Sequence, residues 1–148
     1  AQWYEAFHPN ALERASFFPE NMEAIRESGK LHLIKDERLL TPEVRLRLFD
    51  GHTSGQIVID VETDSHTVIF AGDVIPTSAH LSPTWISAYD VRPLETYYAK
   101  VHLLDKASSN GQIVVYCHDA YTPCSAVKKI NDIYKALPCA MDTNNRVR

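Results

Sequence analysis

The stretch Arg47–Val61, "RLFDGHTSGQIVIDV", places a glycine-flanked histidine between two strand-like runs. The run before it alternates, with Val44, Leu46 and Leu48 on one face and arginines on the other, and the run after it is mostly apolar. Both patterns are typical of β-strands. A tight turn requires Gly, Asn or Asp, but it does not require the His-Thr pair found here. His52 is therefore either a turn residue or a ligand.

The composition is that of one ordinary globular domain. The chain has 148 residues, of which 45% are hydrophobic and 23% are charged, and its formal net charge is −4. That charge argues against binding to nucleic acid or to an anionic membrane, and there is no apolar run long enough to span a membrane. The three cysteines are odd in number and form no C-x-x-C pair, which favours a reducing, cytoplasmic location. A mature secreted chain would look the same once its signal peptide had been removed.

The remaining patterns predict a layered α/β sandwich with a mixed or antiparallel sheet, because strands dominate the first half and helices follow. A long irregular segment, 74–89, contains two prolines and two aromatic residues. Asp90 is a candidate cap for the helix that follows this segment, and Thr122 with Pro123 a candidate start for the last helix. We expect strands at 30–36, 43–49, 56–63, 66–73 and 112–120, helices at 8–17, 19–28, 90–111 and 122–137, and a frayed tail at 138–148.

Three of the predicted strands end in a residue able to bind a metal. These residues are His52, Asp73 and His118. Loops that leave strand ends on one rim of a sheet can converge on one site, and two imidazoles with a carboxylate suit zinc, manganese or iron. Each residue alone has another interpretation: a turn histidine, a turn-capping aspartate, or a histidine bonded to Asp119.

Three segments taken together resemble the later motifs of the metallo-β-lactamase-fold hydrolase superfamily: "GHTSG" at 51–55, "FAGD" at 70–73 and "VVYCHD" at 114–119. The resemblance runs from about Lys30 to the end of the last predicted helix. It implies an αββα sandwich with two metal ions at one edge of its sheets. It also implies the roles of five residues: His52 ligates one metal, Asp73 bridges both and takes part in catalysis, His118 ligates the second, and Thr53 and Asp119 support these ligands.

The superfamily's H-x-H-x-D-H motif is absent upstream of "GHTSG", where the only histidines are His8 and His32. We therefore expect residues 1–148 to form a single partial domain, the C-terminal half of such an enzyme. Half a sandwich exposes one sheet face, so we expect a partner: the missing N-terminal half or another copy of the chain. Three ligands divided between two metals would bind weakly, and the chain alone should be inactive.

For the intact enzyme, the resemblance implies two divalent metal ions, zinc first, with iron or manganese as alternatives. Their bound hydroxide would attack a small ester, lactone, thioester or phosphoester. The long segment resembles pocket walls in such enzymes, so His80, Trp85 and Tyr89 are candidates to line the substrate cleft; ordinary packing is the alternative for each.

Two other functions fit the sequence. A non-catalytic interaction or assembly module would explain the missing motif, although it has no need of three ligands at strand ends. A single structural zinc would require four ligands. Strand alternation places Cys117 on the face opposite His118 and makes it a poor fourth ligand.

Overall fold

A computed structural model describes residues 1–139 of the chain. Its centre is a mixed sheet in which the strands lie side by side in sequence order, and only β4 and β5 pair in parallel. The α/β class and the mixed sheet are therefore confirmed. The strands are β1 (Arg38–Leu39), β2 (Val44–Phe49), β3 (Gln56–Glu62), β4 (Thr67–Phe70), β5 (Ile113–Val115), β6 (Cys124–Ile130) and β7 (Ile133–Pro138).

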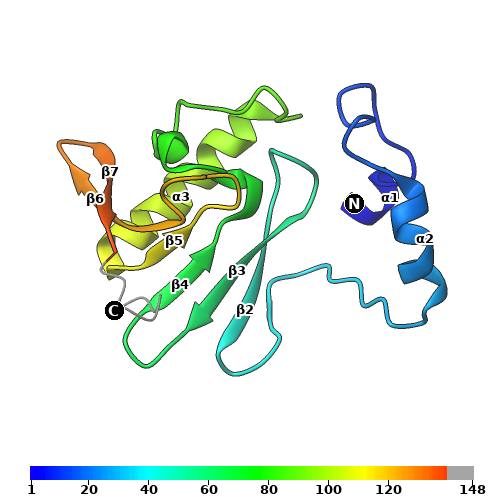
Figure 1. Cartoon of the computed structure of the whole chain (residues 1–148), viewed down its shortest axis with the longest axis horizontal. Coiled ribbons are helices and arrows are strands. Elements are labelled where there is room, and N and C mark those ends of the chain that lie inside the picture. Colours follow the sequence, from blue (N-terminus) through cyan, green and yellow to red (C-terminus); the bar gives the residue numbers. More distant parts are fainter. Residues whose placement is uncertain (140–148) are drawn as a thin grey trace.

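Helix α3 (Pro93–Asn110) covers one face of this sheet (Figure 1). Parallel neighbours need a crossover connection, and α3 supplies it together with the 3-10 turns η1 (Gly72–Val74) and η2 (Ser78–Leu81). The core lies between the helix and the sheet, where the fully buried Leu103 and Leu104 of α3 meet buried valines and Ile69 of the strands. Gly111 ends the helix in a left-handed conformation. The helix predicted at 90–111 is therefore confirmed, although it begins three residues later, at Pro93.

The N-terminal segment lies beside the β2 end of the sheet, on the side away from the β6–β7 hairpin (Figure 1). Helix α2 (Pro19–Glu27) confirms the predicted helix at 19–28, and a short α1 (Gln2–Glu5) precedes it. The helix predicted at 8–17 is wrong. That segment forms turns, in which the Asn10 side chain accepts hydrogen bonds from the backbone N–H groups of Leu12 and Glu13 and so competes with helix formation.

The strand predicted at 30–36 is also wrong, because this segment pairs with no strand in the part of the chain that the structure describes. Alternation favours a strand only where a neighbour supplies the hydrogen-bond ladder, and β2 pairs on that side with β1 instead.

The helix predicted at 122–137 is wrong as well: this segment is the β6–β7 hairpin, so Thr122 and Pro123 precede a strand. Its turn residues, Asn131 and Asp132, have φ values of 49° and 61°. Two successive left-handed residues form the turn that best matches the twist of a two-residue hairpin, and the flanking Ile130 and Ile133 pair directly. The predicted tail at 138–148 lies mostly outside the described residues.

The sheet face opposite α3 is apolar and only partly covered. Strand register places Ile57 beside Leu48 and Phe70 beside Ile59 on this face, and 38% of Ile57 and 41% of Phe70 are exposed. A cavity of about 780 Å³ lies where the N-terminal segment approaches Leu48 and Ile57. We call the set Val44, Leu46, Leu48, Ile57, Ile59, Val61, Val68 and Phe70 the open face.

Arg47 projects toward α3 instead, where its guanidinium donates to Asp60 Oδ1 at 2.6 Å in a buried ion pair.

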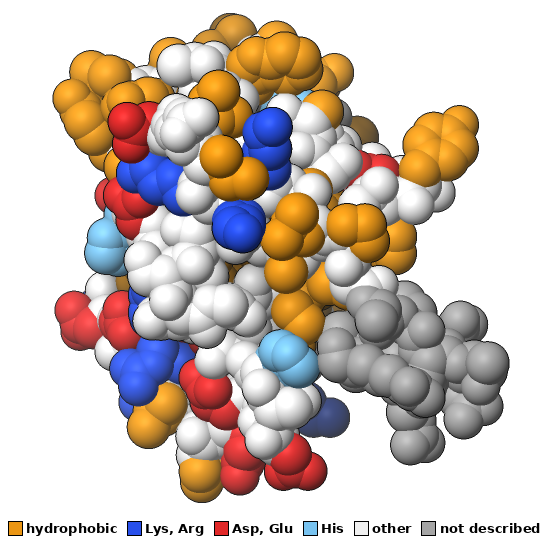
Figure 2. Space-filling view, turned by 90° about the vertical axis from the view of Figure 1, so that its left-hand side faces the viewer, with side chains coloured by type: hydrophobic (Ala, Val, Ile, Leu, Met, Phe, Trp, Pro, Cys, Tyr) orange, Lys and Arg blue, Asp and Glu red, His pale blue; other side chains and the backbone are white. Residues whose placement is uncertain are grey.

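No helix within residues 1–139 is long and apolar enough to cross a membrane. The side of the molecule shown in Figure 2 carries both acidic and basic side chains. All three cysteines are free thiols.

Candidate metal centre

The three predicted ligands lie at one edge of the sheet because of strand direction. β2 and β4 are both antiparallel to β3, and β5 is parallel to β4. The carboxyl ends of β2, β4 and β5 therefore point to the same edge. The loops that leave these ends carry His52, Asp73 and His118.

Asp73 is the centre of this group. Its Oδ2 lies 3.5 Å from Nε2 of His52, and its Oδ1 lies 2.9 Å from Nε2 of His118. The two imidazoles thus lie next to different oxygens of one carboxylate, an arrangement compatible with a ligand that bridges two metal ions. The structure brings together the three residues singled out in the sequence, while their roles as ligands stay a prediction.

Asp90, which the sequence suggested as a helix cap, instead orients His52. The residue at the start of α3 is Arg92, and Asp90 Oδ1 lies 2.7 Å from Nδ1 of His52. The Asp90 side chain is only 1% exposed. This hydrogen bond raises the pKa of His52, against the opposing effect of burial. A proton held at Nδ1 leaves the Nε2 lone pair directed at the site, which is the arrangement a metal-binding imidazole needs.

The loop before His52 is pressed against the start of α3. Gly51 has a φ of +132°, and a Cβ placed on it would lie 2.4 Å from Thr96 Oγ1 and 2.5 Å from Thr96 N. The Gly51 carbonyl also accepts a hydrogen bond from the backbone N–H of Arg92. Only glycine fits this close approach. Gly51 therefore determines the position of the backbone at His52.

Cys117 lies within the site, contrary to the argument from alternation. β5 ends at Val115, so residues 117 and 118 belong to a loop in which strand alternation no longer applies. The Cys117 thiol donates to Asp73 Oδ1 at 3.4 Å. Partial desolvation, followed by the charge of Asp73, raises the pKa of this thiol to about 11. Donor atoms of Asp73, Cys117 and His118 all lie within 4.8 Å of one another.

Thr53 and Asp119, the two residues predicted to support the ligands, form hydrogen bonds with other segments of the chain. Thr53 Oγ1 accepts a hydrogen bond from Gln2 Nε2 at 3.0 Å. Asp119 accepts hydrogen bonds from the backbone and hydroxyl of Ser78 and from the backbone N–H of Thr122, and these hold the pKa of its carboxyl well below the usual range. Asp119 thereby fixes the loop that carries His118.

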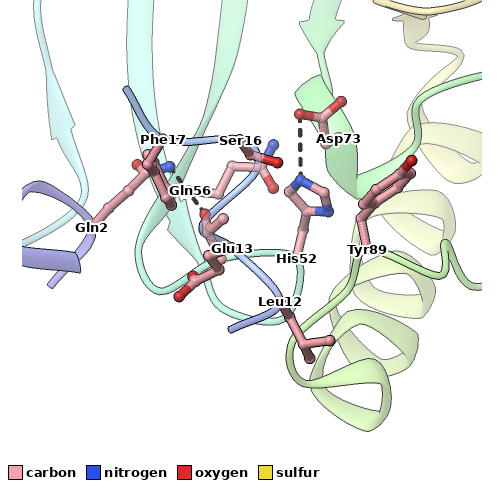
Figure 3. Close-up of a pocket in the computed structure, with 10 residues that line it drawn as sticks. Gln2, Leu12, Glu13, Ser16, Phe17, His52, Gln56, Asp73 and Tyr89 are labelled. Carbon is pink, nitrogen blue, oxygen red and sulfur yellow. Dashed lines mark hydrogen bonds and ion pairs between the residues drawn. The ribbon is translucent and has the colours of Figure 1, made fainter. Parts of the chain in front are cut away.

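A small cavity of about 190 Å³ opens beside His52 and Asp73 (Figure 3). Of the three predicted cleft residues, Tyr89 lines it. His80 Nδ1 is instead hydrogen-bonded to the Thr77 hydroxyl, and Trp85 is 61% exposed. Desolvation, with the charge of a nearby lysine, lowers the pKa of His80. Contact of Tyr89, His80 and Trp85 with a substrate stays a prediction.

The N-terminal segment forms the other wall of this cavity, which the sequence patterns gave no reason to expect. Glu13 is buried there, with Oε2 accepting a hydrogen bond from the Asn10 amide, while Oε1 has no hydrogen-bond partner within residues 1–139. The further lining residues are Gln2, Leu12, Ser16, Phe17, Thr53 and Gln56.

Comparison with known proteins shows the fold. No family model and no curated protein matches the chain. A solved probable metal-dependent hydrolase from Staphylococcus aureus matches with a TM-score of 0.77 and 24% identity, over 93% of this chain and 50% of its own.

Two further hydrolase structures are also similar to this chain in fold. AidC, a dizinc quorum-quenching lactonase, matches with a TM-score of 0.67 and 17% identity, over 89% of this chain and 48% of its own. AbOPH, a hydrolase in the β-lactamase superfamily, matches with a TM-score of 0.68 and 15% identity, over 92% of this chain and 50% of its own. The chain therefore has the metallo-β-lactamase fold over its described part, and it spans about half the length of the structures it matches.

Proposed function

We propose that this chain forms part of a metal-dependent hydrolase. The observation that carries the proposal is the placement of His52 and His118 on opposite oxygens of Asp73. The resemblance in fold to metal-dependent hydrolases supports the same activity.

The side chains present suit divalent metal ions. Imidazole nitrogen and carboxylate oxygen are ordinary ligands of zinc, and a buried carboxylate behind one imidazole is the usual support of such a ligand. When bound, the ions supply Lewis acidity and make water nucleophilic at neutral pH. His52 and His118 would hold one ion each, and Asp73 would hold both. We propose zinc, with iron or manganese as alternatives.

The proposed substrate is a small ester, lactone, thioester or phosphoester. Lactones come first, because the structures similar to this chain include AidC in complex with a product homoserine. The cavity of about 190 Å³ is smaller than the roughly 300–1,000 Å³ pockets that hold drug-sized ligands. Tyr89 lines this cavity, which supports its proposed contact with a substrate bound at Asp73.

We further propose that the open face binds the other half of the sandwich, with a second copy of the chain as the alternative partner. Two observations support this: the face is a continuous apolar surface across β2, β3 and β4, and the chain spans only about half of the structures it matches. Because the other half would supply further ligands, we expect this chain alone to hydrolyse nothing.

A zinc titration tests the ligand assignment. We expect the 148-residue chain to bind zinc, and His52→Ala, Asp73→Asn and His118→Ala each to weaken binding by about tenfold or more. His66→Ala is the matched control, since His66 lies at the far end of the β3–β4 hairpin and should change nothing. Unchanged affinity in all three variants would contradict the proposal.

Hydrolysis assays on the chain together with the proposed N-terminal half then separate catalysis from assembly. Turnover of a homoserine lactone, a chromogenic ester or a phosphotriester that is lost in Asp73→Asn supports the hydrolase. Zinc binding without turnover of any of these substrates favours the non-catalytic assembly module instead.

A further inference from the structure

The Cys117 thiol makes the two sides of Asp73 chemically different. On the Oδ2 side, His52 Nε2 lies at 3.5 Å. On the Oδ1 side, two donors converge: His118 Nε2 at 2.9 Å and Cys117 Sγ at 3.4 Å. One side thus offers nitrogen and oxygen, and the other offers nitrogen, oxygen and sulfur.

We propose that Cys117 is itself a metal ligand, supplying a thiolate to the ion held by His118 and Asp73. This inference rests on the proposed function and adds a donor to it. It predicts that this position selects thiophilic divalent ions, zinc or cadmium, over magnesium and manganese, which prefer oxygen ligands.

The geometry of the three donors suits one small ion. Zinc binds sulfur at about 2.3 Å and nitrogen or oxygen at about 2.0–2.2 Å, so tetrahedral ligand atoms lie roughly 3.3–3.8 Å apart. The donor atoms of Asp73, Cys117 and His118 already lie within 4.8 Å of one another. This spacing is close to that of ligands around one ion, although His118 Nε2 and Asp73 Oδ1, at 2.9 Å, must move slightly apart to admit it.

The backbone holds the two loop donors in this arrangement. The His118 N–H donates to the carbonyl of Pro76 at 2.9 Å, and Asp119 ties the same loop to Ser78 and Thr122. Pro76 and Ser78 follow closely after the 3-10 turn that carries Asp73, so these hydrogen bonds tie the loop of Cys117 and His118 to the segment that follows Asp73.

The other two cysteines do not compete for this role. Cys124 begins β6 and is buried, and its thiol is close to that of Cys139. Cys117 is the exposed thiol, open to an incoming ion. On binding, the S–H bond is replaced by a metal–sulfur bond, and the released proton passes to the buffer.

A cadmium titration of the full chain tests the inference, because a cadmium–thiolate bond has its own ultraviolet charge-transfer absorption. Total bound cadmium is measured in parallel by equilibrium dialysis. We expect the absorption in the wild-type chain, its loss in Cys117→Ser, and its retention in the matched controls Cys124→Ser and Cys139→Ser. Cys117→Ser should also weaken zinc binding by about tenfold or more. Circular dichroism checks that each variant folds.

The outcomes separate this inference from the proposed function. Cadmium bound without the thiolate absorption, but lost in His118→Ala, overturns the role of Cys117 and leaves the metal site standing. Absorption that disappears in Cys124→Ser or Cys139→Ser, and not in Cys117→Ser, places the thiolate elsewhere and also overturns it. No bound cadmium and no bound zinc overturns both.

Discussion

At the scale of single residues, Asp90 shows how a buried carboxylate prepares a ligand. It is separated from His52 by 38 positions, yet their side chains meet at 2.7 Å. No local sequence pattern predicts such a pair. The position of Asp90 just before a helix suggested a helix cap instead. Its effect is to fix which nitrogen of His52 carries the proton.

We predict that Asp90→Asn weakens zinc binding by about 10- to 100-fold, the range found when the partner of a metal-binding histidine is removed. The amide keeps the shape of the side chain but loses the charge that holds the proton at Nδ1. A zinc titration of both proteins measures the effect. Asp64→Asn, in the distant turn between β3 and β4, is the control and should bind like the wild type; equal weakening in both variants would point to a general loss of charge.

Lys100 is a second buried charged group, and its burial makes the stability of the protein depend on pH. It is 1% exposed, and its ammonium donates to the carbonyls of Ser82 and Trp85. Desolvation lowers its pKa to about 8, against the opposing charge of Asp90. Lys100 thus ties the long segment before α3 to the helix itself.

We predict that the free energy of unfolding of the wild type, relative to Lys100→Met, rises between about pH 8 and 10.5 by up to about 3 kcal/mol. A lysine whose pKa falls on folding binds fewer protons in the folded than in the unfolded state over this range, so stability rises with pH. Urea unfolding at several pH values measures both proteins. Parallel pH profiles would show that Lys100 is not the group that titrates.

At the scale of elements, the β2–β3 loop depends on two glycines with different constraints. Gly51 and Gly55 both have positive φ values, but only Gly51 is packed against Thr96. A methyl group at position 55 would have no neighbour within 4 Å among the described residues.

We predict that Gly51→Ala destabilises the protein and weakens zinc binding, because the loop must move away from α3 and takes His52 with it. Gly55→Ala should cost only the left-handed conformation, about 1–2 kcal/mol, with little change in zinc affinity. Denaturant unfolding and zinc titration of both variants measure the difference. Equal zinc affinity in the two would indicate that the loop position does not set the ligand.

The β6–β7 hairpin shows where sequence patterns misled. "TPCSAVKKINDIYKAL" has a plausible helix start, and its apolar spacing over one short segment fits a helix as well as two strands. What decides between them is the edge of β5, which is available to pair with β6, together with two left-handed residues at Asn131 and Asp132. Neither is visible from local spacing.

We predict that Asp132→Gly stabilises the hairpin by about 0.5–1 kcal/mol, because Asn-Gly is the preferred pair for a turn with two left-handed residues. In a helix the same change would destabilise by about 0.3 kcal/mol, so the sign of the effect distinguishes the two structures. Thermal or urea unfolding of the wild type and the variant gives that sign.

At the scale of the whole molecule, the site was predictable to the extent that it follows from strand direction. His52, Asp73 and His118 each follow a strand, and strands of one direction end at one edge. Cys117 and Glu13 were not predictable. The first depends on where β5 ends, and the second on how the N-terminal segment folds back over the sheet.

The open face, which crosses β2, β3 and β4, is a feature of the whole sheet rather than of one strand. Alternation in β2 divides its residues between two faces, and either face could have been the one that is covered. The structure covers the face of Arg47, whose charge is satisfied by Asp60, and leaves the leucine face partly exposed. An apolar surface that crosses three strands favours association.

We predict that the isolated chain binds a hydrophobic dye and self-associates with rising concentration, and that Phe70→Glu suppresses both. Phe70 lies on the open face at 41% exposure, where a charge opposes burial by any partner. Trp85→Glu is the matched control: Trp85 is more exposed, at 61%, but lies outside that face. Sedimentation velocity and dye fluorescence measure the two effects. A chain that stays monomeric and dye-free at high concentration, or one that responds equally to both substitutions, would contradict a docking role for the open face.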